Sequence, residues 1–270
     1  MIELKGKKYK ICVLDTCIIS EFFKNKETLG NRIITKFLNE DYFFAYTYQN
    51  FEELIKAPDI FDELFKYMSV MSTHIVKNHN QLLEDEINEY PNLNRITPFV
   101  LHVPMLQDSE YYEKLKNVFY TPKSKEIFKS SEKEAPSILN DLLSWVDKYP
   151  STKGKYFKKE IELWVELITY KRILEIKKSI LTDFVDKKTP SVDEKKFLSW
   201  TTIGYVTFYK FYFKHRKPRL SDLNDILMSS SYPYVDAVII EKDMADTLKT
   251  IQKKHNFIQN LEIMTLDDFR

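Results

Sequence analysis

The chain has 270 residues, 43% of them hydrophobic, which is enough apolar sequence to bury a large core and excludes a disordered chain. Lys and Arg number 41 against 40 Asp and Glu, so the net charge of +1 excludes a global attraction to nucleic acid and leaves only local basic patches. With 2 cysteines and 4 glycines, the composition excludes a disulfide framework and a glycine-rich phosphate loop, and it favours a reducing, cytoplasmic setting.

Residues 9 to 57 follow a strand–helix–strand–helix pattern. The apolar stretch 11–14 predicts a strand that ends at Asp15. Apolar residues at helical spacing follow within 18–38, and the aromatic, alternating stretch 42–48 predicts a second strand. The sequence therefore places a carboxylate at the end of the first strand.

A helix is expected to begin at Asn50, to carry Glu53 in its first turn and to bend or end at Pro58. Structural alternatives exist for both acids. Asp15 could be a helix N-cap, and Asn50-x-x-Glu53 fits a capping box.

Residues 58 to 218 are predicted to be helical, with no convincing strand. Amphipathic stripes occupy 61–68, 82–87 and 161–168, and the charged stretch 120–135 is expected to be a loop. This block is interpreted as a helical insertion into an α/β domain.

Residues 219 to 270 return to an α/β pattern. Ser221 is expected to begin a short helix, 234–240 to form a strand that ends at Glu241, and 261–266 to form the last strand. We therefore expect one domain built from residues 1–57 and 219–270, interrupted by the helical insertion at 58–218.

Some acidic residues of this last part have an obvious role in the local helix or strand, and others do not. Asp222 lies in the first turn of its helix and could serve the helix dipole, whereas Asp225 lies a full turn further in. Asp236 falls in a stretch suited to a buried strand, where a carboxylate needs a partner or a metal. The alternative is an edge position at the start of that strand.

Strand-end carboxylates favour metal chemistry. Ligand sites of parallel sheets gather at the carboxyl ends of the strands, and Asp15 and Glu241 both follow strands. Converging carboxylates repel one another unless a cation neutralises them, and Mg²⁺ or Mn²⁺ suits a site made only of oxygen ligands. One ion would serve, or two about 4 Å apart.

Four segments together resemble the PIN-domain nucleases: 13–16 (VLDT), 46–54 (YTYQNFEEL), 221–242 and 264–269. The resemblance implies an α/β fold with three α/β/α layers and a parallel sheet, and the activity of a metal-dependent endoribonuclease. A toxin or a defence effector is consistent with it.

Site residues follow from the same resemblance. It implies that the catalytic acids are Asp15, Glu53, Asp225, Asp236 and Glu241, with Asp222 as a weaker choice for the third. Of these, Asp15, Asp225, Asp236 and Glu241 would bind Mg²⁺ or Mn²⁺, and Thr16 is the hydroxyl beside the first aspartate. The sequence departs from the family at Glu241, where Asp is usual, and at Cys17, where a small polar residue is common.

A basic run directly precedes the acidic helix, and it is a candidate for contact with the RNA backbone. Its members in this prediction are Lys214, Arg216, Lys217 and Arg219. The aromatic residues before it are interpreted as part of a core helix, with stacking on RNA bases as the alternative.

The expected partners are an RNA substrate and a protein that binds the helical insertion; no run is long and apolar enough to span a membrane. The alternatives are a catalytically silent binding module of the same fold, suggested by Glu241 and the insertion, and a structure-specific DNA nuclease.

Overall fold

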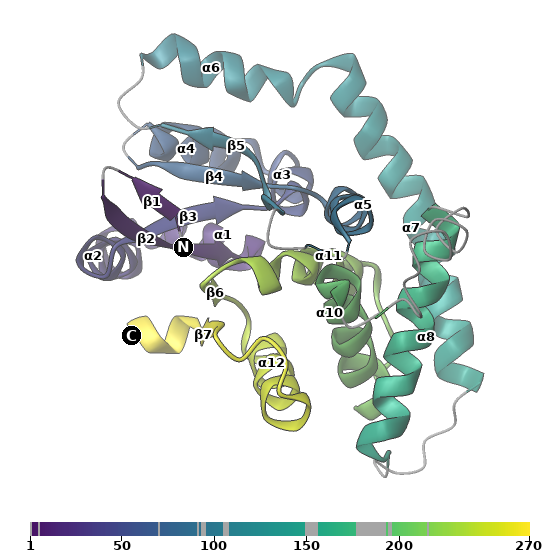
Figure 1. The fold of residues 1–270 in the computed structure, drawn as a ribbon. Coiled ribbons are helices and arrows are strands. Elements are labelled where there is room, and N and C mark those ends of the chain that lie inside the picture. Colours follow the sequence, from purple (N-terminus) through teal and green to yellow (C-terminus); the bar gives the residue numbers. More distant parts are fainter. Residues whose placement is uncertain are drawn as a thin grey trace.

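The computed structural model describes residues 2–4, 6–69, 71–90, 92, 96–104, 108–148, 156–176, 193, 196–214 and 216–270. Its strands are β1 (Ile2–Leu4), β2 (Lys7–Leu14), β3 (Tyr42–Tyr46), β4 (Thr73–Val76), β5 (Phe99–Val103), β6 (Ala237–Ile239) and β7 (Glu262–Met264). They form one sheet in the order β5-β4-β3-β2-β6-β7, with β1 antiparallel to β2. β4 pairs in parallel with β3, β3 with β2, β2 with β6, and β6 with β7, whereas β5 is antiparallel to β4. The protein is therefore an α/β fold with a mostly parallel sheet (Figure 1).

Helices connect and cover these strands. Before β5 they are α1 (Thr16–Lys24), the π-helix η1 (Lys26–Gly30), α2 (Asn31–Asn39), α3 (Tyr48–Leu54), α4 (Pro58–Met68) and α5 (His79–Glu89). Between β5 and β6 they are α6 (Ser109–Val118), α7 (Pro122–Lys148), α8 (Lys158–Ile176), α10 (Leu198–Thr207), the π-helix η4 (Phe208–Phe213), α11 (Leu220–Met228) and the 3₁₀ helix η5 (Ser229–Tyr234). After β6 come α12 (Lys242–His255) and the 3₁₀ helix η6 (Leu266–Phe269).

Alternation along the strands gives the sheet two apolar faces. Cys12 and Leu14 of β2 belong to a core with α1, α2 and α4, whereas Ile11 and Val13 belong to a second core with α10, η4 and α12. A central strand with both faces covered reads as a continuous apolar run, which is what β2 shows. Helices thus pack on both faces, an arrangement compatible with three α/β/α layers.

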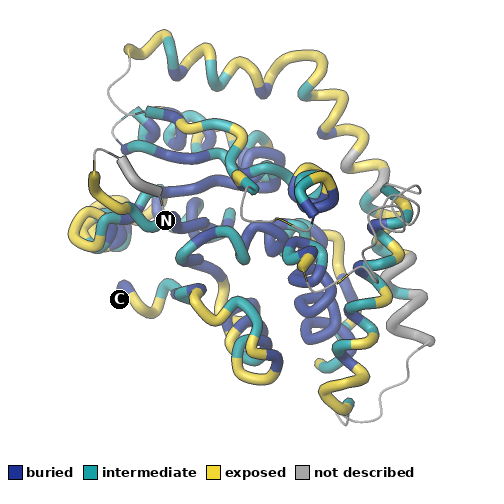
Figure 2. Tube along the Cα trace, viewed as in Figure 1, coloured by how far each residue is buried: buried dark blue, intermediate teal, exposed yellow. Residues whose placement is uncertain are grey.

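Burial follows this layout. Figure 2 shows buried residues concentrated in the central strands and α10, while α6 and α7 form a largely exposed arch along one side. Among the described residues, no helix has the length and apolar character needed to cross a bilayer.

The prediction that residues 58–218 contain no strand is wrong. β4 and β5 lie in this stretch, and β4 pairs in parallel with β3. β4 has only four residues, too few for a recognisable alternation. The loop expected at 120–135 is also wrong, because α7 begins at Pro122, where a proline at the first helical position is tolerated.

The strand expected at 234–240 is shorter than predicted. The 3₁₀ helix η5 extends to Tyr234, and β6 begins only at Ala237. Asp236 therefore precedes the strand instead of lying within it.

Strand order reverses at one point of the sheet. β2 pairs with β3 on one side and with β6 on the other, as Val13 does with Ala45 and Val238. The chain progresses from β2 towards β4 in one direction and from β6 towards β7 in the other. Ligand sites of open α/β sheets form where the order reverses, outside the carboxyl ends of the strands. Here that point lies between Leu14 and Ile239.

Candidate functional site: an acidic edge

Asp15 and Glu241 follow the two strands that meet at this reversal. The Asp15 amide donates to the Ile239 carbonyl at 3.0 Å, which fixes the end of β2 against the end of β6. Each acid occupies the N-cap position of the helix that follows, yet neither side chain makes a capping hydrogen bond. Asp15 thus occupies the cap position that the structural alternative predicts, but without a side-chain capping bond.

Glu53 reaches the same edge from α3. The capping box of α3 is formed by Thr47 and Asn50, not by Asn50 and Glu53, so the structural alternative for Glu53 is wrong. Instead, Asn224 Nδ2 of α11 donates to Glu53 Oε1 at 2.7 Å. Because Asp225 is the next residue, this bond also holds α11 and its carboxylate beside α3. We call Asp15, Glu53, Asp225 and Glu241 together the acidic edge.

Electrostatics confirm that the four carboxylates share one neighbourhood. Burial and the charges of Asp225, Glu241 and Glu53 raise the pKa of Asp15 to about 7, and the nearby Cys17 amide lowers it only in part. Burial also raises the pKa of Asp225, and Glu53 and Glu241 add to the rise. Asp15 is 7% exposed, so the repulsion acts where water screens it poorly.

Two uncharged groups border the acidic edge. Burial and the charges of Asp15 and Glu241 raise the pKa of the Cys17 thiol, so it is a neutral thiol at physiological pH. Tyr232 is fully buried within the field of Asp15 and Asp225, and its hydroxyl has no hydrogen-bond partner among the described residues. A buried hydroxyl without a partner marks a place where a water or another polar group is expected.

Asp222 and Asp225 have separate roles. Asp222 is 2% exposed and accepts from the Arg219 amide at 2.8 Å and from Arg216 Nη2 at 2.8 Å. Lys210 Nζ lies 3.0 Å from Asp222 Oδ1 and 2.6 Å from Asp225 Oδ2. Asp222 is therefore occupied by the protein's own cations and amides, and Asp225 is the acid that α11 contributes to the edge.

Asp236 is not part of the acidic edge. Its Oδ2 accepts from the Ile11 amide at 2.9 Å, and its own amide donates to the Ile11 carbonyl at 2.9 Å. Ile11 is three residues before the end of β2, so Asp236 lies towards the amino end of β6, roughly 10 Å of strand away from the carboxyl end. Its carboxylate secures the start of a strand, the edge alternative raised by the sequence.

Thr16 lies at the acidic edge with a structural contact. Asn50 Nδ2 donates to Thr16 Oγ1 at 3.0 Å and to the Leu14 carbonyl at 3.1 Å, while Asn50 Oδ1 accepts from the amide and hydroxyl of Thr47. All the hydrogen-bonding capacity of a fully buried side chain is thus used to join the turn that carries Asp15 to the start of α3.

The predicted basic residues divide into two pairs. Lys214 Nζ bonds Asp243 Oδ1 at 2.6 Å, and Arg216 contacts both Asp243 and Asp222. Lys217 and Arg219 are exposed, and within the described part of the chain their side chains form no ion pair. Only the second pair offers uncommitted charge to a phosphate.

A pocket of about 670 Å³ opens at the carboxyl ends of β6 and β7. It is lined by Cys17, Ile18, Ser20, Glu21, Lys24, Ile240, Glu241, Lys242, Asp243, Thr265, Leu266 and Asp267. Its charged lining consists of four acids and two lysines, and Lys24 is paired with Glu21, so the pocket is net acidic beside Glu241.

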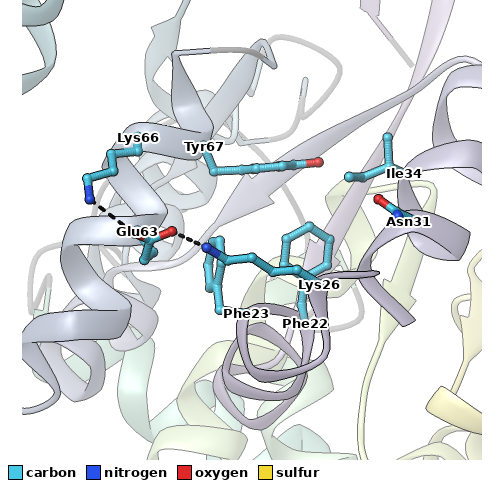
Figure 3. Close-up of a pocket in the computed structure, with 8 residues that line it drawn as sticks. All are labelled: Phe22, Phe23, Lys26, Asn31, Ile34, Glu63, Lys66 and Tyr67. Atoms are coloured by element: carbon cyan, nitrogen blue, oxygen red, sulfur yellow. Dashed lines mark hydrogen bonds and ion pairs between the residues drawn. The ribbon is translucent and has the colours of Figure 1, made fainter. Parts of the chain in front are cut away.

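A second pocket, of about 270 Å³, lies between α1, η1, α2 and α4 (Figure 3). It is lined by Phe22, Phe23, Lys26, Asn31, Ile34, Glu63, Lys66 and Tyr67. Figure 3 shows both lysines directed at Glu63, with which each forms an ion pair. The pocket offers aromatic surface, and its lining cations are already neutralised.

Four polar residues at the acidic edge were not found from the sequence: Asn50, Lys210, Asn224 and Tyr232. Lys210 carried a recognisable signal, because a lysine inside an aromatic core stretch must be paired. The other three carried none, since buried amides and a tyrosine look like ordinary helix residues.

The four carboxylates of the acidic edge are chemically suited to bind a hard divalent cation, but in this structure they lie too far apart to share one. All four donors of the acidic edge are carboxylate oxygens, and the unpartnered Tyr232 hydroxyl points to a missing polar group nearby. Within the described residues, however, no three His, Cys, Asp or Glu side chains lie close enough together to hold a metal ion. An ion would have to draw the carboxylates inward.

Comparison with known proteins adds no family to these observations: no family model, curated protein or solved structure matches this chain.

Proposed function

We propose that this protein is a metal-dependent endoribonuclease with a PIN-like fold. The observation that carries the proposal is Asp15, a buried carboxylate at the strand reversal whose pKa is raised to about 7 by burial and three neighbouring carboxylates. Strong perturbation by like charges in a crevice is typical of functional sites. The resemblance of the four segments to PIN-domain nucleases supports RNA as the substrate.

Each acid has a distinct task in this proposal. Asp15, Asp225 and Glu241 would hold Mg²⁺ or Mn²⁺, and Glu53, fixed by Asn224, would orient the attacking water from the flank. The bound ion supplies an activated water and neutralises charge on the phosphate. Lys217 and Arg219 would contact the RNA backbone, since they are the uncommitted members of the basic run.

The test is cleavage of labelled RNA by the purified full chain with Mn²⁺, Mg²⁺ or EDTA. We expect Mn²⁺-dependent cleavage, and we expect Asp15→Asn to lower kcat/KM by roughly 100-fold or more. Asp267→Asn is the matched control, because Asp267 lines the pocket beside Glu241 but is exposed and pairs with Arg270. Undiminished cleavage by Asp15→Asn would overturn the assignment.

A catalytically silent binding module remains the second candidate, because the carboxylates of the acidic edge are not spaced to hold an ion. It predicts no cleavage of RNA or DNA with either metal. A parallel panel of single-stranded and branched DNA separates the third candidate, a DNA nuclease, which would cut only those substrates.

A further inference from the structure

The carboxylate of Asp243 is held between two cations of the basic run. Lys214 Nζ donates to Asp243 Oδ1 at 2.6 Å and Arg216 Nη1 donates to Asp243 Oδ2 at 3.2 Å, so each oxygen has its own cation. Partial burial raises the pKa of Asp243, but the Lys214 hydrogen bond and the charges of both cations outweigh it and leave the pKa below its ordinary value. We call Lys214, Arg216 and Asp243 together the Asp243 bridge.

Both cations are oriented by contacts that do not involve the Asp243 carboxylate. Arg216 Nη2 donates to Asp222 Oδ1 at 2.8 Å, and Asp222 is only 2% exposed. Lys214 Nζ also donates to Oγ1 of the buried Thr247 at 3.1 Å. These contacts would keep the two cations in place if the Asp243 carboxylate turned away. A pair of cations that is oriented in advance loses less entropy when it binds an anion.

The Asp243 carboxylate is the replaceable member of the bridge. Its side chain is 46% exposed, against 33% for Lys214 and 35% for Arg216. Ion pairs at such exposure contribute little to stability, because water and salt screen them. A backbone phosphate offers the same arrangement, with two acceptor oxygens that share one negative charge, and it forms strong charge-assisted bonds with Arg and Lys. A phosphate can therefore displace this carboxylate at small cost.

The Asp243 bridge borders the acidic edge. Asp243 follows Glu241 by two residues, and both line the pocket at the carboxyl ends of β6 and β7. Arg216 is joined through Asp222 to α11, the helix that carries Asp225. Because the acids of this edge repel phosphates, a substrate backbone needs cations at its border.

We propose that Lys214 and Arg216 form a binding site for a phosphate of the RNA backbone, which the Asp243 carboxylate occupies in the free protein and leaves when RNA binds. The inference rests on the proposed function in that the ligand is RNA, but it requires no metal ion. Asp243 acts as an internal competitor of the RNA, so its removal raises the affinity for RNA.

The test is binding of a short fluorescein-labelled single-stranded RNA, followed by fluorescence anisotropy with EDTA present so that no cleavage occurs. We expect Asp243→Asn to bind this RNA roughly 5- to 10-fold more tightly than the wild type, because two oriented cations lose their competitor. The plot of log K against log salt should become steeper by about 0.7, the value for one further phosphate contact on a single strand. Thermal melts should show little change in Tm, since Asp243 is exposed.

Glu63→Gln is the matched control. Glu63 also pairs with two lysines, Lys26 and Lys66, but in the pocket of Figure 3, which is lined by no residue of the acidic edge. The control variant changes the net charge by the same amount and also releases two cations, so it measures the non-specific gain. Its affinity for RNA should equal that of the wild type.

A double variant assigns the gain to a named cation. Asp243→Asn combined with Lys214→Met should lose most of the gain, because the phosphate then has only Arg216. This non-additivity is a readout that a merely structural ion pair would not give.

Unchanged RNA affinity in Asp243→Asn, or an equal gain in Glu63→Gln, would overturn the inference and leave the proposed nuclease intact. Absence of RNA binding in both wild type and Asp243→Asn would also overturn it. The expected gain without Mn²⁺-dependent cleavage would support the inference and overturn the nuclease. Calorimetry with inorganic phosphate separates the source of the phosphate. Tighter binding of inorganic phosphate by Asp243→Asn, without tighter binding of RNA, would overturn RNA as the ligand.

Discussion

Two buried carboxylates of this protein have a pKa raised to about 7 in surroundings that differ completely. Asp15 lies among three other carboxylates, all of which raise its pKa further. Glu86 of α5 is fully buried, and its oxygens accept from the amide and hydroxyl of Ser199, at 2.7 and 2.6 Å, and from the Tyr234 hydroxyl. Burial alone raises the pKa of Glu86, and these donors oppose the rise.

The difference shows that a raised pKa does not by itself identify a functional site. Glu86 is satisfied by the protein and joins α5 to α10 and η5, so it is a structural group. Asp15 is surrounded by carboxylates that its charge repels, a condition that a proton on Asp15 relieves and that a bound cation would also relieve. The kind of neighbour, more than the size of the shift, separates the two roles.

The largest effect expected from this comparison is a loss of metal-free stability as pH rises. Between about pH 4 and pH 7 the folded protein retains protons on Asp15 and Glu86 that the unfolded chain has released. The contribution of these two groups to the free energy of unfolding therefore falls with rising pH in this window and levels off above it. The part due to Asp15 is roughly 4 kcal/mol.

Urea denaturation from pH 4 to 8 measures this loss of stability, and two variants separate the contributions of the two acids. Asp15→Asn and Glu86→Gln should each remove the contribution of the substituted acid to the pH dependence of the free energy of unfolding. Mn²⁺ at pH 8 should restore the stability lost through Asp15 but not that lost through Glu86. An equal gain of stability with Mn²⁺ in wild type and Asp15→Asn would contradict the contrast between the two sites.

Removal of the Glu86 side chain should cost about 3 kcal/mol of stability, because Glu86→Ala leaves two donors of Ser199 and one of Tyr234 without an acceptor in the core. Chemical denaturation near pH 6 gives the value. Cleavage per folded molecule should change little, since Glu86 is not part of the acidic edge. A strong loss of kcat with normal stability would instead give Glu86 a catalytic role.

Tyr234 and Tyr232 allow a matched test two residues apart in η5. Tyr234→Phe removes a hydroxyl that bonds Glu86 and should cost about 1–2 kcal/mol. Tyr232→Phe removes an unpartnered hydroxyl and should be neutral or slightly stabilising without metal. If Tyr232 orders a water at the acidic edge, its variant alone should lower Mn²⁺-dependent kcat. Thermal melts and kinetics on both variants decide, and equal losses of stability would show that Tyr232 is satisfied.

The smallest effect concerns Asn224, which holds Glu53 at the acidic edge. Asn224→Ala should cost about 1 kcal/mol of stability and weaken Mn²⁺ binding roughly 10-fold, as is typical for residues that orient metal ligands. Asn117→Ala, at an exposed position of α6, is the control. Calorimetric Mn²⁺ titration of both variants gives the comparison, and unchanged affinity in Asn224→Ala would remove its positioning role.

The sequence predicted the strands that carry the acidic edge because those strands are central. β2 and β3 are covered on both faces, so their apolar runs are long, and Asp15 stands out as the first interruption. The α/β class and the approach of Asp15, Glu53, Asp225 and Glu241 follow from that signal together with the resemblance.

The rest depended on contacts that a sequence does not display. β4 and β5 are short strands towards the edge of the sheet, and they belong to the same sheet although they lie in the block predicted to be helical. Asp236 was assigned to the metal site from its apolar surroundings and the resemblance, and the sequence did not reveal that its carboxylate accepts from the Ile11 amide, far from the carboxyl ends of the strands. The pairing of Lys210 with Asp225 joins two helices and cannot be read from either alone.

The pairing of β2 with β6 also sets the order in which the protein can become active during synthesis. Asp15 and Glu53 leave the ribosome early, whereas Asp225 and Glu241 follow only after α4 to α10. Contacts between segments so far apart in sequence form late in folding. A nascent chain carries half of the acidic edge until α11 has emerged, and the last member, Glu241, follows only after β6. If the protein is the ribonuclease proposed above, it is harmless to the ribosome and messenger RNA that surround it for most of its own translation.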